Sequence, residues 1–398
     1  MNPFRLRYSK AILLLLIGIA SLMQTGCAVH PQEARPSAPR PDGIRAESRS
    51  AAEERLSDES QAALSQPAQI KHPRKPVRAI YVTANVARSS RMDRLISLVE
   101  QTELNAMVID VAGAFGKSKD AAGRIRVVET RSAPKLQQLV QRLKQRHIYV
   151  IARVVTFKDP GLAALKPSLA LQSKTGGVWK DRSGSAWIDP YRQDAWPYPL
   201  AVAEFAARMG FDEIQFDYVR FPENEARVNR EVRFRNPEGL SKNEIIRRFL
   251  HVAAARVHRA GAFVSADVFG LVATPGPDSG IGQSWRTVAT EVDVISPMIY
   301  PSHYDPGMWG IAKPDLVPGA VVAHALQDAT KQNRKLQAAG IQTAQVRPWL
   351  QSFTAGWVHP HQRYGPAQIR EQVRAARRAG IDSYMLWNAA SRYPLLSA

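Results

Sequence analysis

Residues 210–222 carry a group of polar and aromatic side chains that could do chemistry. Apolar and polar residues alternate as far as Asp217, and Tyr218 and Arg220 follow before a proline at position 222. A strand whose C-terminal end carries an acid, an aromatic ring and a guanidinium group is typical of the mouth of a (β/α)8 barrel. The alternative is a strand that stops at an aspartate capping the next helix.

A second carboxylate ends the next strand-like segment, where Asp267 lies within residues 262–269. Neighbouring strands lie about 4.8 Å apart, so Asp217 and Asp267 are expected at the separation of roughly 5–9.5 Å found in glycosidases. One carboxylate would be the nucleophile or base, held ionised by Arg220 or Arg153. The other would be the acid, because burial and a charged neighbour raise the pKa of a carboxyl group.

Further polar and aromatic side chains lie at or just after the ends of expected strands, and we assign them to substrate binding. They are Asp110, Arg153, Lys158, Trp187, Tyr218, Arg220, Tyr300, His303, Tyr304, Trp349, Trp387 and Asn388. The aromatic members are expected to form platforms for sugar rings. The opposite strand ends show no comparable collection, an asymmetry typical of catalytic or ligand-binding barrels.

Other chemistries fit this sequence less well. His303 is the only histidine at an expected strand end and no HExxH spacing occurs, so we expect no histidine-based metal site and no cofactor. A divalent cation held by Asp110, Asp217 and Asp267 remains an alternative. Lys158 as a Schiff-base lysine is a weaker one, because it follows its strand in a loop.

The elements that must position these residues alternate along the chain from residue 77. Strands are expected at 77–84, 104–111, 148–155, 212–219, 262–269, 292–300, 345–353 and 381–387. Helices are expected at 89–102, 132–146, 193–209, 241–260, 283–291, 317–339 and 366–379. Near-continuous apolar strands between amphipathic helices predict an α/β fold, a (β/α)8 TIM-type barrel. Two separate α/β domains are the alternative.

Several segments resemble a bacterial family of glycoside-hydrolase-like barrels that is distantly similar to the α-amylase-type barrels. They are Tyr81–Asn85, Phe157–Pro160, Gly177–Asp181, Gln215–Pro222, Ser265–Gly270, Ser296–Tyr304, Arg347–Gln351 and Leu386–Asn388. The resemblance covers residues 77–393 in order. It implies a glycosidase with its nucleophile at the end of strand four and its acid at the end of strand five. Asp217 and Asp267 match those positions, although the α-amylase-type acid is usually a glutamate.

Barrel-type chitinases differ from this chain at the decisive position. Their fourth strand reads Asp-x-x-Asp-x-Asp-x-Glu, and the final Glu is the acid. The corresponding residues here are Asp212, Gln215, Asp217 and Val219. Valine replaces the acid, so a chitinase-like, substrate-assisted mechanism is not expected.

Residues 1–27 have the layout of an export signal, with basic residues followed by an apolar run. Cys27, the only cysteine, lies where a bacterial lipoprotein signal carries its lipidated residue, although Gln24 stands where Leu or Val is usual. The single cysteine excludes disulfides within the chain and a cysteine nucleophile in the barrel. An ordinary cleaved signal or an uncleaved anchor is the alternative.

Residues 28–76 are rich in Pro, Ala, Ser, Arg and Glu, which predicts a disordered linker before a domain at 77–398. Position 28 is alanine rather than the aspartate that retains lipoproteins at the inner membrane. We therefore expect a lipid anchor in the outer membrane on the periplasmic side. A soluble periplasmic or secreted protein is the alternative.

The net charge of +19, from 54 Lys and Arg against 35 Asp and Glu, indicates anionic partners or a generally basic surface. Export argues against nucleic acid and favours anionic glycans or lipid head groups. The expected function is hydrolysis of an envelope or extracellular polysaccharide by a monomer. The alternative is a catalytically inactive, glycan-binding envelope lipoprotein.

Overall fold

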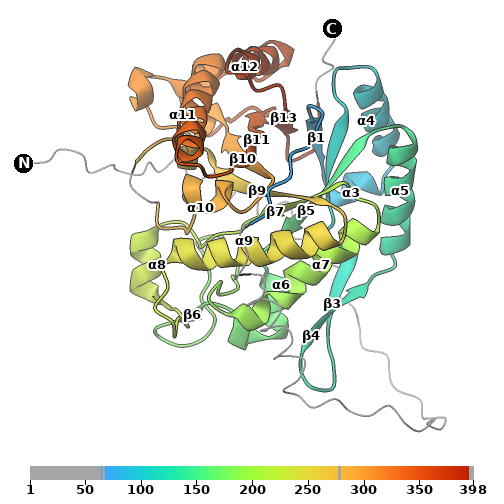
Figure 1. The fold of residues 1–398 in the computed structure, drawn as a ribbon, viewed down its shortest axis with the longest axis vertical. Coiled ribbons are helices and arrows are strands. Elements are labelled where there is room, and N and C mark those ends of the chain that lie inside the picture. Colours follow the sequence, from blue (N-terminus) through green and yellow to red (C-terminus); the bar gives the residue numbers. More distant parts are fainter. Residues whose placement is uncertain (1–63, 65–67, 277–278, 394–398) are drawn as a thin grey trace, which may run out of the picture.

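The computed structural model describes residue 64 and residues 68–276 and 279–393, in which a parallel sheet closes into a barrel. The expected signal at 1–27, including Cys27, lies outside the described residues. The sheet runs in the order β11-β10-β12-β13-β1-β2-β5-β7-β9, and β9 pairs with β10 to close it. All its pairings are parallel. This confirms the TIM-type barrel (Figure 1).

The barrel strands follow the expected segments with tighter bounds. They are β1 (Arg78–Val82), β2 (Ala106–Asp110), β5 (Tyr149–Val155), β7 (Glu213–Asp217), β9 (Phe263–Phe269), β10 (Val294–Ile299), β11 (Gln345–Val346), β12 (Trp349–Gln351) and β13 (Tyr384–Trp387). β11 and β12 both pair with β10 and share one position in the wall. Pro348 lies between them, and proline lacks the N–H that a continuous ladder needs.

Helices cover the outside of the barrel, as Figure 1 shows. They include α4 (Arg91–Glu100), α5 (Ala133–Gln145), α7 (Pro197–Arg208), α9 (Lys242–Arg259), α10 (Trp285–Ala289), α11 (Pro318–Ala338) and α12 (Pro366–Arg378). The start of α9 illustrates why they begin where they do, because the Ser241 side chain accepts a hydrogen bond from the Glu244 backbone N–H at 3.1 Å. Among the described residues, no helix is both long enough and apolar enough to cross a membrane.

The loops carry smaller elements that the hydrophobic pattern did not predict. They are α3 (Ala84–Ala87), the hairpin of β3 (Phe115–Lys119) and β4 (Ile125–Glu129), α6 (Pro160–Leu165), β6 (Gln172–Ser173), α8 (Glu225–Glu231) and β8 (Val232–Arg233). The segment after β7 carries Arg227, Arg230, Arg233 and Arg235 and is called the Arg-rich insertion below. It contains β8, which pairs with β6 in the loop after β5, so the two segments support each other.

The barrel interior is apolar in its middle and polar at both ends. Tyr81, Val108, Ile151 and Met385 belong to one buried apolar cluster. At the N-terminal end, Arg347 donates two hydrogen bonds to Glu213, at 2.8 and 2.9 Å. The expectation that no polar collection lies at these strand ends was therefore wrong. Its cause is the register, which brings Arg347, between β11 and β12, within hydrogen-bond distance of Glu213 at the start of β7.

Removing one partner of this floor ion pair is expected to destabilise the fold. Glu213→Gln leaves the fully buried Arg347 guanidinium without a countercharge, and breaking such a pair costs about 3–5 kcal/mol of the free energy of unfolding. Urea denaturation measures the loss. The double variant Glu213→Leu/Arg347→Met removes both charges and is expected to lie closer to the wild type. Equal stability of Glu213→Gln and the wild type would contradict this account.

Residues 68–76, expected as linker, lie against the N-terminal end of the barrel. The Lys71 backbone N–H donates to Asp293 at 2.5 Å, and Gln342 and Gln345 donate to the carbonyl oxygens of Ile70 and Pro73 at 2.9 and 3.3 Å. The ordered domain therefore begins before residue 77. The chain enters the barrel at the face opposite the C-terminal strand ends.

Candidate active site

Register brings the predicted acids together at the C-terminal end of the barrel. Asp110 pairs with Arg153 across β2 and β5, and Gln215 and Phe216 pair with Ser265 and Ala266, so the next residues, Asp217 and Asp267, follow side by side. The predicted pair of carboxylates on adjacent strands therefore exists.

Arg153 joins two of the acids. Its Nη1 donates to Asp110 Oδ1 at 3.0 Å, and its Nε and Nη2 donate to Asp217 Oδ2 at 3.0 and 2.5 Å. The side chains of Arg153 and Asp110 are each only 4% exposed. Of the two cations expected to hold Asp217, Arg153 is the one that does so.

Asp217 lies on a tightly turned backbone. The Tyr218 backbone N–H donates to Asp217 Oδ1 at 2.6 Å, and Tyr218 has φ of 52°, in the left-handed region that a non-glycine residue rarely adopts. The Asp217 side chain remains 10% exposed. This strained turn after β7 aims the carboxylate into the mouth with fixed hydrogen bonds.

Asp267 is buried more deeply, with 2% of its surface exposed. Trp349 Nε1 donates to Asp267 Oδ1 at 2.8 Å. Burial, and secondly the negative charge of Asp217, raise the pKa of Asp267 well above its ordinary value. A carboxyl group in this environment keeps its proton to a higher pH than an ordinary aspartate does, which suits a general acid.

An aromatic group lines the Asp110 side of the mouth. Tyr81 donates from its hydroxyl to Asp110 Oδ2 at 2.7 Å and stacks on Trp387, with ring centroids 4.1 Å apart. The Arg153 guanidinium lies 5.6 and 5.5 Å from these two ring centroids. Trp387 is half-buried and keeps part of its ring accessible.

Two further predicted cations, Arg220 and Lys158, pair with other acids rather than with Asp110, Asp217 or Asp267. Arg220 pairs with Glu223 at 2.6 Å and lies over the ring of Tyr218 at 4.9 Å. Lys158 pairs with Asp181 at 3.2 Å. Asp181 also accepts from the indole N–H of the neighbouring fully buried tryptophan at position 187. That ring supports the mouth from beneath and offers no face to a sugar.

The other predicted substrate contacts differ in how far they reach the mouth. Tyr300 is buried beside the acids: burial first, then the charges of Asp267 and Asp217, raise its pKa. His303 is half-buried, and desolvation lowers its pKa to about 3, so its ring is neutral. Tyr304 is buried against Trp309 rather than exposed as a platform. Asn388 donates to the Ser352 carbonyl at 2.6 Å, and its side-chain oxygen accepts from the Ala390 backbone N–H at 3.0 Å.

Several contacts of the acids were not predicted. Gln283, at the start of the α10 region, donates to the Asp267 carbonyl at 2.9 Å and accepts from the Phe269 backbone N–H at 3.2 Å. Tyr81 was part of the family resemblance but not of the predicted site. No local sequence signal marks Gln283, because it reaches the site only through the tertiary fold.

A metal does not account for this arrangement. Arg153 lies between Asp110 and Asp217 and gives hydrogen bonds to both. Within the part of the chain that the structure describes, no cluster of three or more His, Cys, Asp or Glu side chains could hold an ion. The Asp110 and Asp217 carboxylates are therefore arranged around the guanidinium group of Arg153.

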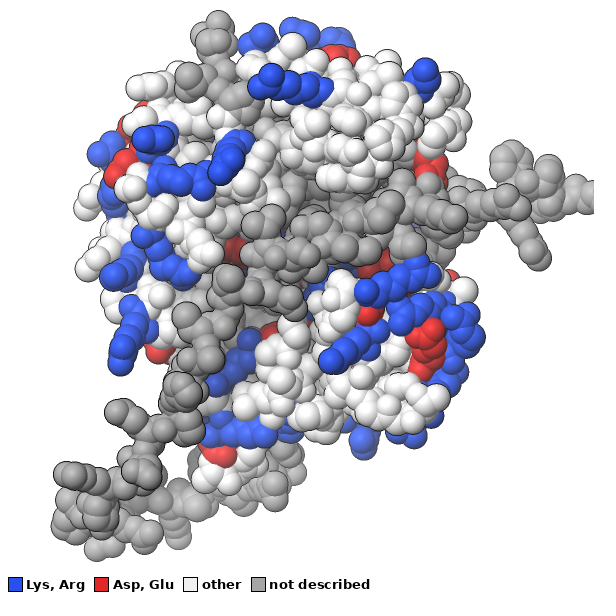
Figure 2. Space-filling view, turned by 180° about the vertical axis from the view of Figure 1, so that it is seen from behind, with Lys and Arg blue, Asp and Glu red and all other residues white. Residues whose placement is uncertain are grey.

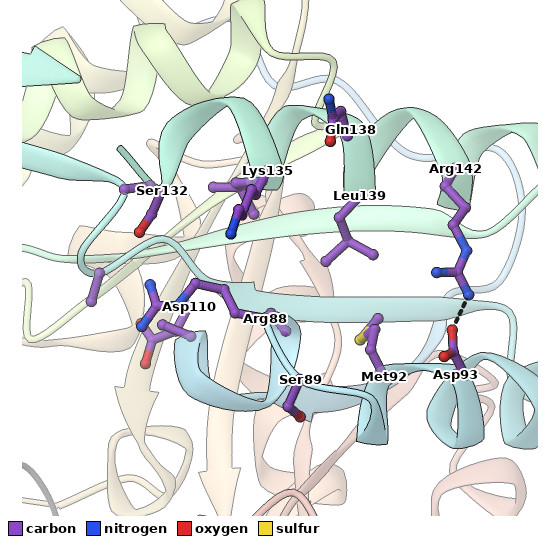
Figure 3. Close-up of a pocket in the computed structure, with 15 residues that line it drawn as sticks. Arg88, Ser89, Met92, Asp93, Asp110, Ser132, Lys135, Gln138, Leu139 and Arg142 are labelled. Carbon is purple, nitrogen blue, oxygen red and sulfur yellow. Dashed lines mark hydrogen bonds and ion pairs between the residues drawn. The ribbon is translucent and has the colours of Figure 1, made fainter. Parts of the chain in front are cut away.

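A groove of about 340 Å³ runs between α4 and α5, outside the barrel wall (Figure 3). Met92 and Leu139 supply apolar walls, and Arg88 and Lys135 lie along its edge. The Asp93–Arg142 ion pair closes one end, as the dashed line in Figure 3 marks. Asp110 contributes to the lining of this groove, whereas Arg153, Asp217 and Asp267 do not.

Basic side chains are spread in several groups over the face that Figure 2 shows. In the Arg-rich insertion, Arg227 pairs with Glu231 at 2.8 Å and lies over Trp179 at 5.2 Å. Arg230 pairs with the same glutamate at 3.2 Å. Arg227 and Arg230 therefore share a single countercharge.

Comparisons with known proteins agree with the barrel and with a glycosidase family. A family model described as "Putative glycosyl hydrolase domain" matches residues 79–393. No curated protein sequence matches the chain.

Solved structures resemble the chain to different extents. A hypothetical protein from Ruminiclostridium thermocellum is 36% identical, covering 48% of this chain and 97% of that protein, with a TM-score of 0.39. The PgaB (BpsB) glycoside hydrolase domain from Bordetella bronchiseptica is 17% identical, covering 79% and 94%, with a TM-score of 0.54. An α-galactosidase from Thermus thermophilus is 13% identical, covering 85% and 63%, with a TM-score of 0.46. The Bordetella likeness supports the fold alone.

Proposed function

This chain belongs to the glycosyl hydrolase domain family, and on that premise we propose that it cleaves glycosidic bonds with Asp217 and Asp267. The observation that carries the proposal is the contrast between two adjacent carboxyl groups. Asp217 accepts two hydrogen bonds from Arg153, whereas burial raises the pKa of Asp267. Two carboxyl groups in different environments are what glycoside hydrolysis needs.

In the proposed reaction, Asp267 protonates the leaving-group oxygen of the scissile bond. Asp217 acts on the anomeric carbon, directly as nucleophile or through a water as base. Arg153 gives Asp217 two hydrogen bonds and orients it, and the Tyr218 backbone N–H fixes its second oxygen. Trp349 holds Oδ1 of Asp267, which leaves Oδ2 to carry the proton.

The substrate that we propose is a bacterial envelope or extracellular polysaccharide, with anionic glycans included. The net charge of +19 and the cationic edge of the α4–α5 groove favour an anionic chain. The test is to incubate the chain without its first 27 residues with purified envelope glycans and to measure new reducing ends. Retaining residues 68–76 in this protein preserves their contacts with the barrel floor.

A glycan-binding protein without catalysis is the second candidate, and the depth of the acids favours it. Asp267 is 2% exposed and the Asp217 side chain 10% exposed, so a substrate must displace neighbouring side chains to reach both. Glycan binding without any new reducing ends, at pH values on both sides of neutrality, would support this candidate over the glycosidase.

We further propose that a lipid on Cys27 anchors the protein to the outer membrane, on the periplasmic side. The chain enters at the barrel floor, so an anchor ahead of residue 68 would leave the mouth free to meet glycan. Cys27→Ser is expected to move the protein from the membrane fraction to a soluble or unprocessed form with unchanged specific activity. Wild-type protein found wholly in the soluble periplasm would instead indicate ordinary secretion, with Gln24 defeating the lipid signal.

A further inference from the structure

An exposed tryptophan stands in the loop that follows β12. Among the described residues, the strongly exposed large apolar side chains are Val128, Val317 and Trp357, and Trp357 is the only aromatic one. Trp357 is 38% exposed as a whole residue, and its indole lies nearly parallel to the ring of Phe353, with an interplanar angle of 18° and centroids 6.1 Å apart. Because the exposed ring lies against a second aromatic ring, it is available for stacking against a ligand.

This pair continues inward to the carboxylates. Phe353 meets Tyr300 edge to face, with centroids 5.6 Å apart, and both contact the neutral ring of His303 at 6.4 and 5.0 Å. Tyr300 belongs to the same buried cluster as Trp349, whose indole N–H donates to Asp267. Trp357, Phe353 and Tyr300 therefore form a continuous row of rings from solvent to the acid.

The loop that carries Trp357 is held in place by polar contacts. The buried Asp315 carboxylate accepts from the Gln362 backbone N–H at 3.0 Å, and the Asp315 carbonyl accepts from the Tyr364 hydroxyl at 3.0 Å. The Tyr364 backbone N–H donates to Thr354 Oγ1 at 3.1 Å. These contacts fasten both ends of the loop, so the exposed indole is presented on a built platform and little ordering is needed on binding.

We propose that Phe353 and Trp357 form a stacking subsite for a sugar ring of the glycan chain. This sugar lies beyond the two sugar residues that the scissile bond joins. The electron-rich face of an aromatic ring attracts the partly positive C–H groups on the apolar face of a pyranose. Polar hydroxyl groups at the rim of the sugar stay in water, as a half-open platform allows. This subsite rests on the proposed glycosidase function and adds a contact that selects long chains over short ones.

The test compares Trp357→Ala with Trp357→Phe in the full chain. The probes are the polysaccharide released from the envelope of the bacterium that makes this protein, and size-fractionated oligosaccharides prepared from it. Trp357→Ala is expected to raise KM for long chains, and Kd for them in the Asp217→Asn background, by about 2- to 10-fold. It should leave kcat/KM for the shortest cleaved oligosaccharide unchanged. Trp357→Phe keeps a ring and should behave like the wild type.

Three results would overturn the subsite. They are an unchanged KM in Trp357→Ala, an equal loss on short and long oligosaccharides, and a Trp357→Phe variant as impaired as Trp357→Ala. Any of these three results, with active wild-type enzyme and inactive Asp217→Asn, leaves the glycosidase function standing. Failure of the Asp217→Asn protein to bind any of the probes would count against both.

Discussion

Asp217→Asn is expected to lower kcat by about 10³-fold or more, since a positioned acid–base group alone contributes roughly 10²–10⁴-fold. Glycan affinity should stay within a few-fold of the wild type, because the aromatic surfaces of the mouth are untouched. Asparagine can keep its oxygen for the Tyr218 backbone N–H, but its NH2 group then faces the donors of Arg153. It also lacks the negative charge that Arg153 contacts. The measurements are initial rates from new reducing ends and Kd for the same glycan.

Asp110→Asn is the matched control for this variant. It also weakens a contact of the Arg153 guanidinium, on the other side, and should share any loss of stability. Asp110, on β2, lies two strands further from Asp267 than Asp217 does, so its replacement should cost much less activity than that of Asp217. Equal rates for Asp217→Asn and the wild type would rule out the proposed mechanism. Equal losses in both variants would assign the effect to Arg153 rather than to the carboxylate.

The fold could be predicted because its signals are local and repeated. Every expected strand and helix has a counterpart, since buried parallel strands read as apolar runs and helices such as α9 begin at a capping serine. The hairpin β3–β4 and the β6–β8 pair could not be predicted in the same way. Their strands are short and mostly only half-buried, and the β6–β8 pair forms because two loops far apart in the sequence meet.

The candidate site could be predicted in part. Position at a strand end was enough to bring Asp217 and Asp267 together, because the barrel register does the rest. Sequence position could not say which cation meets which acid: Arg220 points to Glu223, while Arg153 takes both central contacts. These choices depend on side-chain direction and on neighbours that only the closed barrel brings close.

Exposure of aromatic rings was the least predictable property of the site. The rings at positions 187 and 349 were expected as platforms, yet both are almost fully buried. Trp357 was not singled out, and it is the exposed one, because its loop leaves the wall after a short strand. Whether a ring at a strand end is core or platform depends on what packs over it, which residue type and spacing do not specify.

Asp267→Asn is expected to separate activity from stability. The amide cannot donate a proton to the leaving group, so kcat should fall by roughly 10²–10⁴-fold. The variant keeps an oxygen to accept from Trp349 Nε1 and the same shape in a fully packed site. Replacing the carboxyl group also removes the cost of ionising it beside Asp217.

The pH dependence gives this prediction its sign. The folded protein holds the Asp267 proton to a higher pH than the unfolded chain, because burial raises the pKa of the folded-state carboxyl. Between the ordinary pKa, near 3.9, and the raised value, the folded state binds more protons, so this group's contribution to the free energy of unfolding falls as pH rises. The wild type should therefore lose both stability and activity as pH passes upward through that pKa.

Asp267→Asn should lack this loss of stability and be at least as stable as the wild type at alkaline pH. Urea denaturation and kcat/KM measured across pH test both parts, and an active variant, or one with the wild-type pH profile of stability, would remove Asp267 from the role of acid.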